Sequence, residues 1–263
     1  MRRQRGAPRA GVGRSSGAPH LAALGAYRSA TRRTRAQARL RWWWCPFPAV
    51  EAEVPIEGDV LEIGCGHGLL SCYLAAAAPG RRVTGIDIDA DKIVEARVAA
   101  GRLAGPGTGS LRFAAVEAGY QPEGRFDAIV VVDVLYLLSA GGQRRLLAAA
   151  AGALRPGGVL VVKESATTPR WKYRWCRFQE TLATRVLGVT AGGGEGLVFL
   201  GPEAYGEWLT GAGLDVTDTP LHRGYVWPHH LVVARRPTPA TPATPATPAT
   251  PATPRIPRQK AGF

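Results

Sequence analysis

Short apolar runs alternate with helical patterns through the middle of the chain. Five segments have the apolar content of strands buried in a sheet, and these are residues 60–63, 83–86, 111–119, 126–138 and 159–165. Helical patterns lie between several of them, at residues 69–78, 90–100 and 143–158, the last ended by a Pro-Gly-Gly turn. The alternation predicts an α/β fold built on a doubly wound, mostly parallel sheet.

The pattern changes after residue 165. A long insert is followed by a helical segment, "GPEAYGEWLTGAG", and then by "LDVTDTPL" and "HHLVVARR", which have the pattern of two paired antiparallel strands. We therefore expect a Rossmann-like sheet of about seven strands that ends in a C-terminal antiparallel pair.

A glycine-rich turn follows the first predicted strand, in the stretch "VLEIGCGHGLL". Glycine is costly in a regular element, so Gly64, Gly66 and Gly68 indicate a tight turn or a close approach to the backbone. A turn that joins a strand to a helix in an α/β sheet is a common ligand site, because backbone N–H groups face the crevice there. The alternative is a glycine-rich turn without a ligand.

An acid ends the second predicted strand. Asp87 follows Gly64 by 23 residues, close to the offset of roughly 20 at which nucleotide-binding folds place an acid on the ribose hydroxyls. The alternative role for Asp87 is to cap the helix at residues 90–100, which Asp89 can do equally well.

Four segments now resemble a known family. In order, "VLEIGCGHG", "VTGIDID", "FDAIVVVDVLYLL" and "LRPGGVLVVKE" resemble the class I S-adenosylmethionine-dependent methyltransferases over roughly residues 54–234. The glycines run G-x-G-x-G, where nicotinamide-binding relatives have G-x-G-x-x-G, and Glu62 lies two positions before the first glycine. Both details favour the methyltransferase family.

The resemblance implies S-adenosylmethionine as the cofactor and ten residues that bind it. These are Glu62, Gly64, Cys65, Gly66, Gly68, Asp87, Ile88, Glu117, Ala118 and Asp133. By analogy, the glycines and Glu62 serve the methionine part, Asp87 holds the ribose and Ile88 packs on the adenine. Glu117 and Ala118 stand where the family often has an Asp-Ala pair, so the glutamate is a departure. Glu62 could instead be a buried acid that holds the loop, and Asp133 could cap the following turn.

The acceptor side of the reaction has weaker signals. If the methyl group goes to a hydroxyl or carboxyl oxygen, a base is useful, and five residues are candidates, each with a structural role as its alternative. They are Tyr136, Glu164, His222, His229 and His230. His67 lies in the glycine turn, but one histidine without other ligands does not predict a metal site, and the four cysteines form no C-x-x-C pair.

The net charge of +13 belongs to the two ends of the chain. Residues 1–50 hold eleven arginines and residues 235–263 hold five basic residues, neither with an acid, so all 20 acidic residues lie between them. We expect three parts: a disordered Arg-rich segment at 1–40, a methyltransferase domain at 41–236, and a disordered Thr-Pro-Ala-rich tail at 237–263. The first segment also resembles a transit peptide, although an over-extended start would give the same composition.

The insert after the fifth strand is expected to select the acceptor. In residues 169–188, read as a helix, an aromatic stripe (Trp171, Trp175, Phe178) lies beside an arginine stripe, which could seat an anionic amphiphile or contact a membrane surface. The alternative is a buried aromatic face with solvated arginines. The cluster "RWWWCPFP" is a candidate lid over the cofactor.

We therefore predict a methyltransferase that acts on a small-molecule or lipid-like acceptor. Since no apolar stretch reaches about 18 residues, we expect a cytoplasmic protein with at most peripheral membrane contact; the oligomeric state is left open. A second hypothesis is a non-catalytic nucleotide-binding module whose Arg-rich tails tether it to nucleic acid or membrane. A nucleic-acid substrate is not expected, because "VDVLYLL" stands where an Asn-Pro-Pro-Tyr type motif would be.

Overall fold

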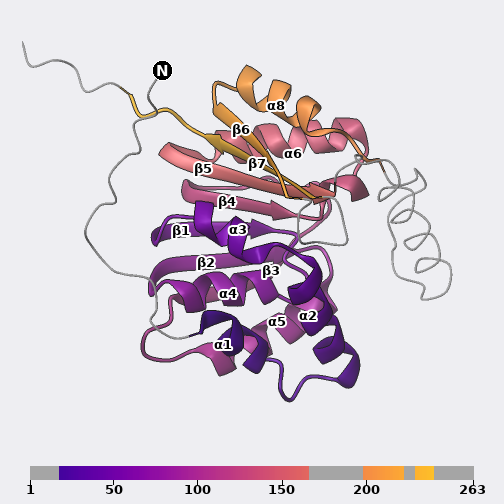
Figure 1. Cartoon of the computed structure of the whole chain (residues 1–263), viewed down its shortest axis with the longest axis vertical. Helices are drawn as coiled ribbons and strands as arrows, with labels where there is room; N and C mark the ends of the chain where they lie inside the picture. Colours follow the sequence, from indigo (N-terminus) through magenta and orange to yellow (C-terminus); the bar gives the residue numbers. More distant parts are fainter. Residues whose placement is uncertain (1–17, 166–197, 222–228, 240–263) are drawn as a thin grey trace, which may run out of the picture.

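A seven-stranded sheet forms the centre of the molecule (Figure 1). The computed structural model describes residues 18–165, 198–221 and 229–239. The strand order is β3-β2-β1-β4-β5-β7-β6, with parallel pairing from β3 to β5 and antiparallel pairing of β7 with β5 and with β6. The strands are β1 (Glu57–Ile63), β2 (Gly80–Asp87), β3 (Ser110–Ala115), β4 (Phe126–Val132), β5 (Leu154–Ser165), β6 (Asp215–Pro220) and β7 (His229–Arg235). The predicted fold class and the terminal antiparallel pair are confirmed.

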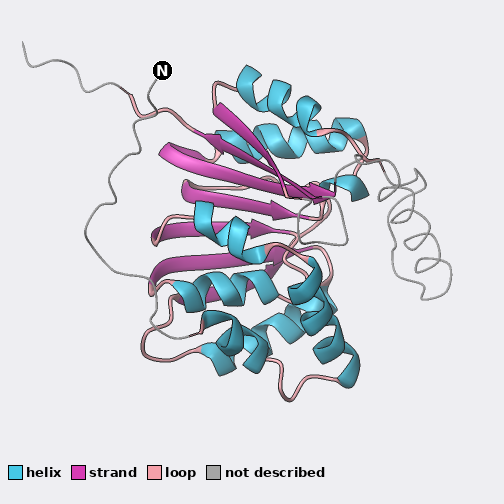
Figure 2. Cartoon of the chain, in the orientation of Figure 1, coloured by secondary structure: helices cyan, strands magenta, loops and turns pink. Residues whose placement is uncertain are grey.

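Helices cover both faces of the sheet (Figure 2). They are α1 (Pro19–Gly25), α2 (Arg32–Trp44), α3 (Phe47–Glu53), α4 (Leu69–Ala77), α5 (Ala90–Leu103), the short 3-10 helix η1 (Leu135–Leu137), α6 (Ala140–Gly152) and α8 (Pro202–Gly211). Helices α1 to α5 share one hydrophobic core with the sheet, and α6 and α8 share the other. The result is a three-layer α/β architecture.

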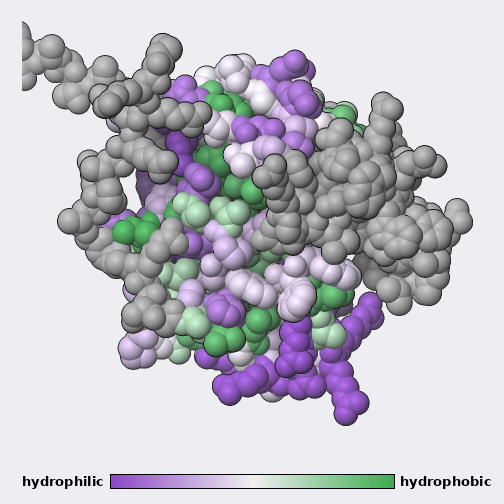
Figure 3. All heavy atoms as spheres, in the orientation of Figure 1, coloured by the Kyte–Doolittle hydropathy of each residue, from purple (hydrophilic) through white to green (hydrophobic). Residues whose placement is uncertain are grey.

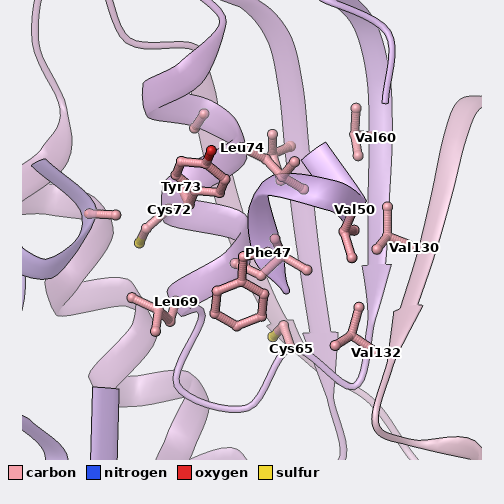
Figure 4. Packing of buried hydrophobic residues seen from close by; sticks show 14 of the residues in the cluster. Phe47, Val50, Val60, Cys65, Leu69, Cys72, Tyr73, Leu74, Val130 and Val132 are labelled. Carbon is pink, nitrogen blue, oxygen red and sulfur yellow. The ribbon is translucent and has the colours of Figure 1, made fainter. Parts of the chain in front are cut away.

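The central strand β4 shows why the sheet folds this way. Ala128, Val130 and Val132 belong to the core on the side of α3 and α4, whereas Ile129 and Val131 belong to the core on the side of α6. A strand buried on both faces needs apolar residues at consecutive positions, which is the pattern of this segment. Figure 4 shows the first core, where Phe47 of α3 lies among side chains of α4, β1 and β4.

Several predicted boundaries are wrong. The helix predicted at residues 143–158 ends at Gly152, since β5 begins at Leu154, and the strand predicted at 111–119 ends at Ala115. Residues 126–138 are not one strand: β4 ends at Val132, Asp133 has a left-handed φ of 57°, and η1 follows. The prediction of disorder for residues 1–40 fails for the described part, which is largely helical. Its apolar residues are buried by tertiary contact with the domain, for example Tyr27, 2% exposed, whose hydroxyl donates to the carbonyl of His67 at 2.6 Å.

Several predictions fall on residues that the structure does not describe. They concern residues 1–17 of the Arg-rich segment, the aromatic and arginine stripes of residues 169–188, His222 and the C-terminal tail beyond residue 239. Within the described ranges, no helix has both the length and the apolar content needed to cross a membrane.

Candidate functional site

The glycine turn after β1 has three alternate residues in left-handed conformation. Gly64, Gly66 and Gly68 have φ values of 74°, 55° and 80°. A Cβ at Gly64 would overlap the side chain of Val134, and one at Gly68 would overlap Phe113. A Cβ at Gly66 would meet nothing within 4 Å. Packing within the protein therefore explains two of the glycines, and Gly66 is the one that a ligand could approach.

Asp87 at the end of β2 holds this turn. The N–H of Gly66 donates to Asp87 Oδ2 at 2.7 Å, and the N–H of Asp89 donates to Asp87 Oδ1 at 2.9 Å. Asp89 itself caps α5 by accepting from the N–H of Lys92 at 3.1 Å, so the helix cap is the role of Asp89. Each carboxylate oxygen of the half-buried Asp87 can accept a further hydrogen bond. The next residue, Ile88, is 64% exposed.

Glu62 lies beneath the turn and is only 2% exposed. The hydroxyl of Ser71, in the first turn of α4, donates to Glu62 Oε2. Burial raises the pKa of Glu62 to about 7, against the opposing effects of the Ser71 hydrogen bond and of Arg41. Glu62 therefore ties β1 to α4, which is the alternative given above for this residue, and burial likewise raises the pKa of the neighbouring Cys65 thiol.

A charged cluster lies where β4 and β5 end. Lys163 Nζ, 1% exposed, donates to Asp133 Oδ1 at 2.5 Å, and Arg41 Nη2 from α2 is 3.8 Å from Asp133 Oδ2. The thiol of Cys45 also donates to Asp133 Oδ2, at 3.6 Å. Burial alone would raise the pKa of Asp133, but Lys163 and Arg41 outweigh it and lower the pKa, so this carboxylate is ionised.

Glu164 lies next to this cluster and is 5% exposed. Its Oε1 accepts from the N–H groups of Val134 and Leu135, at 2.9 and 2.7 Å. Burial, followed by the negative charge of Asp133, raises its pKa to about 8. Near neutral pH Glu164 is therefore mainly protonated, and it lines a small pocket with Tyr205 and His230 among its other walls.

Contact between Val134 and Gly64 joins the two groups of residues into one site. Arg41 interacts with both groups. Burial alone would lower the pKa of Arg41, but the negative charges of Asp133 and of Glu62 outweigh it, and the pKa is raised. The structure thus brings together the predicted residues at the ends of β1, β2, β4 and β5 along one edge of the sheet (Figure 1). Glu117 and Ala118, which follow β3, are exposed beside the same edge.

The remaining catalytic candidates have partners of their own. Tyr136 stacks on Phe199, with ring centroids 5.2 Å apart. His229 is buried, and its Nε2 is 2.9 Å from the carbonyl oxygen of Trp44, to which it donates. His230 Nδ1 is 3.0 Å from Asp218 on β6. These contacts give each side chain a structural role.

Sequence reasoning missed Arg41, Cys45 and Lys163. A lysine inside the apolar run "VLVVKES" was the available signal, because a lysine buried in a strand requires an acidic partner. The part played by Arg41 and Cys45 depends on how α2 lies against the domain, which has no local signal. In the described parts of the chain, no three His, Cys, Asp or Glu side chains are grouped so that they could hold a metal ion.

Comparisons with known proteins found methyltransferases. Residues 61–160 match a family model described as a methyltransferase domain, whereas no curated protein sequence matches the chain. A SAM-dependent methyltransferase from Methanosarcina mazei is similar in structure, with 20% identity, a TM-score of 0.56, and coverage of 73% of this chain and 98% of that one.

Two further solved structures are similar. Magnesium protoporphyrin IX methyltransferase from Synechocystis PCC 6803, with bound SAH, has 19% identity, a TM-score of 0.57, and coverage of 81% of this chain and 91% of that one. An O-methyltransferase family protein from Burkholderia thailandensis has 19% identity and a TM-score of 0.54, over 79% of this chain but only 61% of that one. At these identities the similarity concerns the fold.

Proposed function

We propose that the chain is a class I S-adenosylmethionine-dependent methyltransferase that methylates a small-molecule or lipid-like acceptor; residues 61–160 match a methyltransferase domain model, and the fold is similar to that of a SAM-dependent methyltransferase. The observation that carries the proposal is the open approach to Gly66, whose N–H is held by Asp87. A half-buried left-handed glycine with open space at its Cα, beside a carboxylate with spare acceptor capacity, fits a ligand with ribose hydroxyls.

The cofactor, when bound, supplies an already activated methyl group. The protein must then bind it, align the acceptor and exclude water. Asp87 would hold the ribose and the exposed Ile88 would cover the adenine, while Gly66 allows the chain to approach the ligand. Asp133, fixed by Lys163 and Arg41, would mark the methionine end of the site.

We assign the acceptor to the pocket beside Glu164. Apolar side chains such as Val162 and Leu200 lie there beside the polar Tyr205 and His230, so an acceptor that approaches Glu164 meets both kinds of surface. Because two backbone N–H groups occupy Oε1 of Glu164, its Oε2 is the atom that would take a proton from an acceptor hydroxyl. One of the similar proteins is by its own description a magnesium protoporphyrin IX methyltransferase, so the fold accommodates small acceptors.

Calorimetric titration of the full chain with S-adenosylmethionine, S-adenosylhomocysteine and NAD tests the cofactor. Binding of the first two and not of NAD is expected; binding of NAD alone, or no binding, would contradict the assignment. Incubation with methyl-labelled cofactor and a panel of hydroxy, carboxy and lipid acceptors then tests turnover. Cofactor binding with no transfer to any acceptor would favour the non-catalytic module.

A further inference from the structure

The side of α2 that faces away from the domain has an unusual composition. We call it the outer face of α2, and its eight exposed residues are Arg32, Arg33, Ala36, Gln37, Arg39, Leu40, Trp43 and Trp44. They form two neighbouring stripes, each with the spacing i, i+4, i+7, i+11 of one helical face. The half of this face nearer the start of the helix is basic, the other half is mainly apolar, and neither half contains an acid.

Neither half is explained by the stability of the helix. Arg32 and Arg33 occupy the first turn, where the helix dipole favours acids and opposes positive charge. Trp43 is 80% exposed and Leu40 is 45% exposed, so much of their apolar surface contacts water. Both features become favourable when the outer face binds something anionic and apolar.

The surroundings of α2 strengthen the positive charge. Besides the three arginines of the outer face, Arg28 and Arg35 lie in the same part of the chain, and the first acid of the chain is Glu51. Figure 3 shows hydrophilic side chains gathered at the bottom of the view, where Figure 1 places the beginning of α2. Any ligand of this surface therefore meets several arginines without an acidic neighbour on the helix.

We propose that the outer face of α2 docks the protein on an anionic lipid membrane. Arginines pair with lipid phosphates, and tryptophan is favoured at the boundary between headgroups and acyl chains. The order along the helix, with arginines first and Leu40, Trp43 and Trp44 last, matches a segment that inserts its C-terminal end at this boundary. Nucleic acid fits less well, because it offers no apolar layer for Leu40.

The inner side of the same helix reaches the candidate site. Arg41 lies 3.8 Å from Asp133, and Cys45, the C-cap of α2, donates to the same carboxylate. Docking would therefore bring the site within one helix of a source of lipid-like acceptors. That consequence rests on the proposed function, whereas the docking itself does not and is measured without cofactor or acceptor.

Sedimentation of the full chain with vesicles tests the proposal. Phosphatidylcholine vesicles that contain phosphatidylglycerol should bind the chain, and pure phosphatidylcholine vesicles should not. Replacing Arg32, Arg33 and Arg39 by Gln should lower the partition coefficient by about a hundredfold, since each basic residue near an anionic surface strengthens binding by about fivefold. The double variant Leu40→Ala/Trp43→Ala should weaken binding by a comparable factor.

Matched controls use exposed residues on other elements. The charge control replaces three exposed arginines on β3 and α6 by Gln: Arg112, Arg144 and Arg145. The apolar control, Val94→Ala/Val98→Ala, removes exposed apolar surface from α5. Both should bind within about twofold of the unaltered chain, since surface changes away from the contact have small effects. Equal binding to both vesicle types, or variants of the outer face that bind like the controls, would overturn the proposal. So would tight oligonucleotide binding that depends on the three arginines but not on Trp43.

Discussion

The N–H of Gly66 donates to a carboxylate oxygen of Asp87 at 2.7 Å, so the turn after β1 is held by the end of β2. Asp87 therefore has a structural role that does not depend on a ligand. Its second oxygen accepts from the N–H of Asp89, which begins the cap of α5. The same carboxylate therefore sets the shape of the glycine turn and the start of the next helix, while retaining capacity for ribose hydroxyls.

Asp87→Ala should weaken the binding of S-adenosylhomocysteine by about 1–3 kcal/mol, the cost of leaving hydrogen-bonding groups unpaired. It should also lower the melting temperature, because the N–H of Gly66 loses its partner. Calorimetry and thermal denaturation measure the two effects. Asp91→Ala, an exposed acid in the first turn of α5, is the control. If Asp87→Ala bound S-adenosylhomocysteine as tightly as the unaltered chain, Asp87 would not be the residue that holds the ribose.

Alanine substitutions at Gly66 and at Gly64 should differ in their effect on folding stability. Gly66→Ala strains a left-handed residue by roughly 1–2 kcal/mol without a clash, so the chain should fold but bind cofactor poorly. Gly64→Ala has the same strain and also overlaps Val134, so its loss of folding stability should be larger, by about 1–3 kcal/mol. Urea denaturation of both variants gives the comparison. Equal stabilities would show that the contact with Val134 is not what requires glycine at position 64.

Much of the fold could be predicted because its signals are local. The strands, the antiparallel pair and the cap at Asp89 follow from periodicity and residue type within a few positions. The charged cluster could not be predicted in the same way, since Cys45 and Asp133 are 88 positions apart. Helices α1 and α2 have no sustained apolar period, and their order depends on burying side chains such as Tyr27 and Ala38 against the domain.

Lys163→Met should destabilise the fold by about 3–5 kcal/mol, because it leaves the Asp133 carboxylate without its closest counterion in a largely buried position. Adding Asp133→Asn should recover part of the loss, since the uncompensated charge is then gone. Chemical denaturation of the single and double variants measures this coupling. Lys92→Met breaks a half-exposed ion pair with Asp89 and should cost less than about 1 kcal/mol. If Lys163→Met and Lys92→Met lowered the free energy of unfolding by similar amounts, Lys163 would not be the counterion that stabilises the buried Asp133.

The buried Glu62 should make stability fall as pH rises. Its pKa is raised from an ordinary value near 4.5 to about 7, so the folded state holds a proton that the unfolded state releases in this window. Its contribution is fully present below about pH 4.5 and is lost as pH rises through 7, with a slope of at most about 1.4 kcal/mol per pH unit. In Glu62→Gln this slope should flatten between pH 5 and 7, whereas Glu123→Gln, an exposed control, should match the unaltered chain. Parallel stability curves for all three would refute the raised pKa.

Glu164 should control the rate of transfer to an oxygen acceptor. Its pKa of about 8 means that the basic form falls about tenfold for each pH unit below this value, so the rate should rise with pH and level off above 8. In Glu164→Gln the amide oxygen can still accept from Val134 and Leu135, so folding and cofactor affinity should be nearly unchanged. The turnover number should fall by about 10²–10⁴, the usual contribution of a general base, and its pH dependence should disappear. Glu203→Gln, an exposed acid on α8, controls for the loss of charge. A Glu164→Gln variant that keeps both its rate and its pH profile would show that this buried acid only fixes the turn after β4.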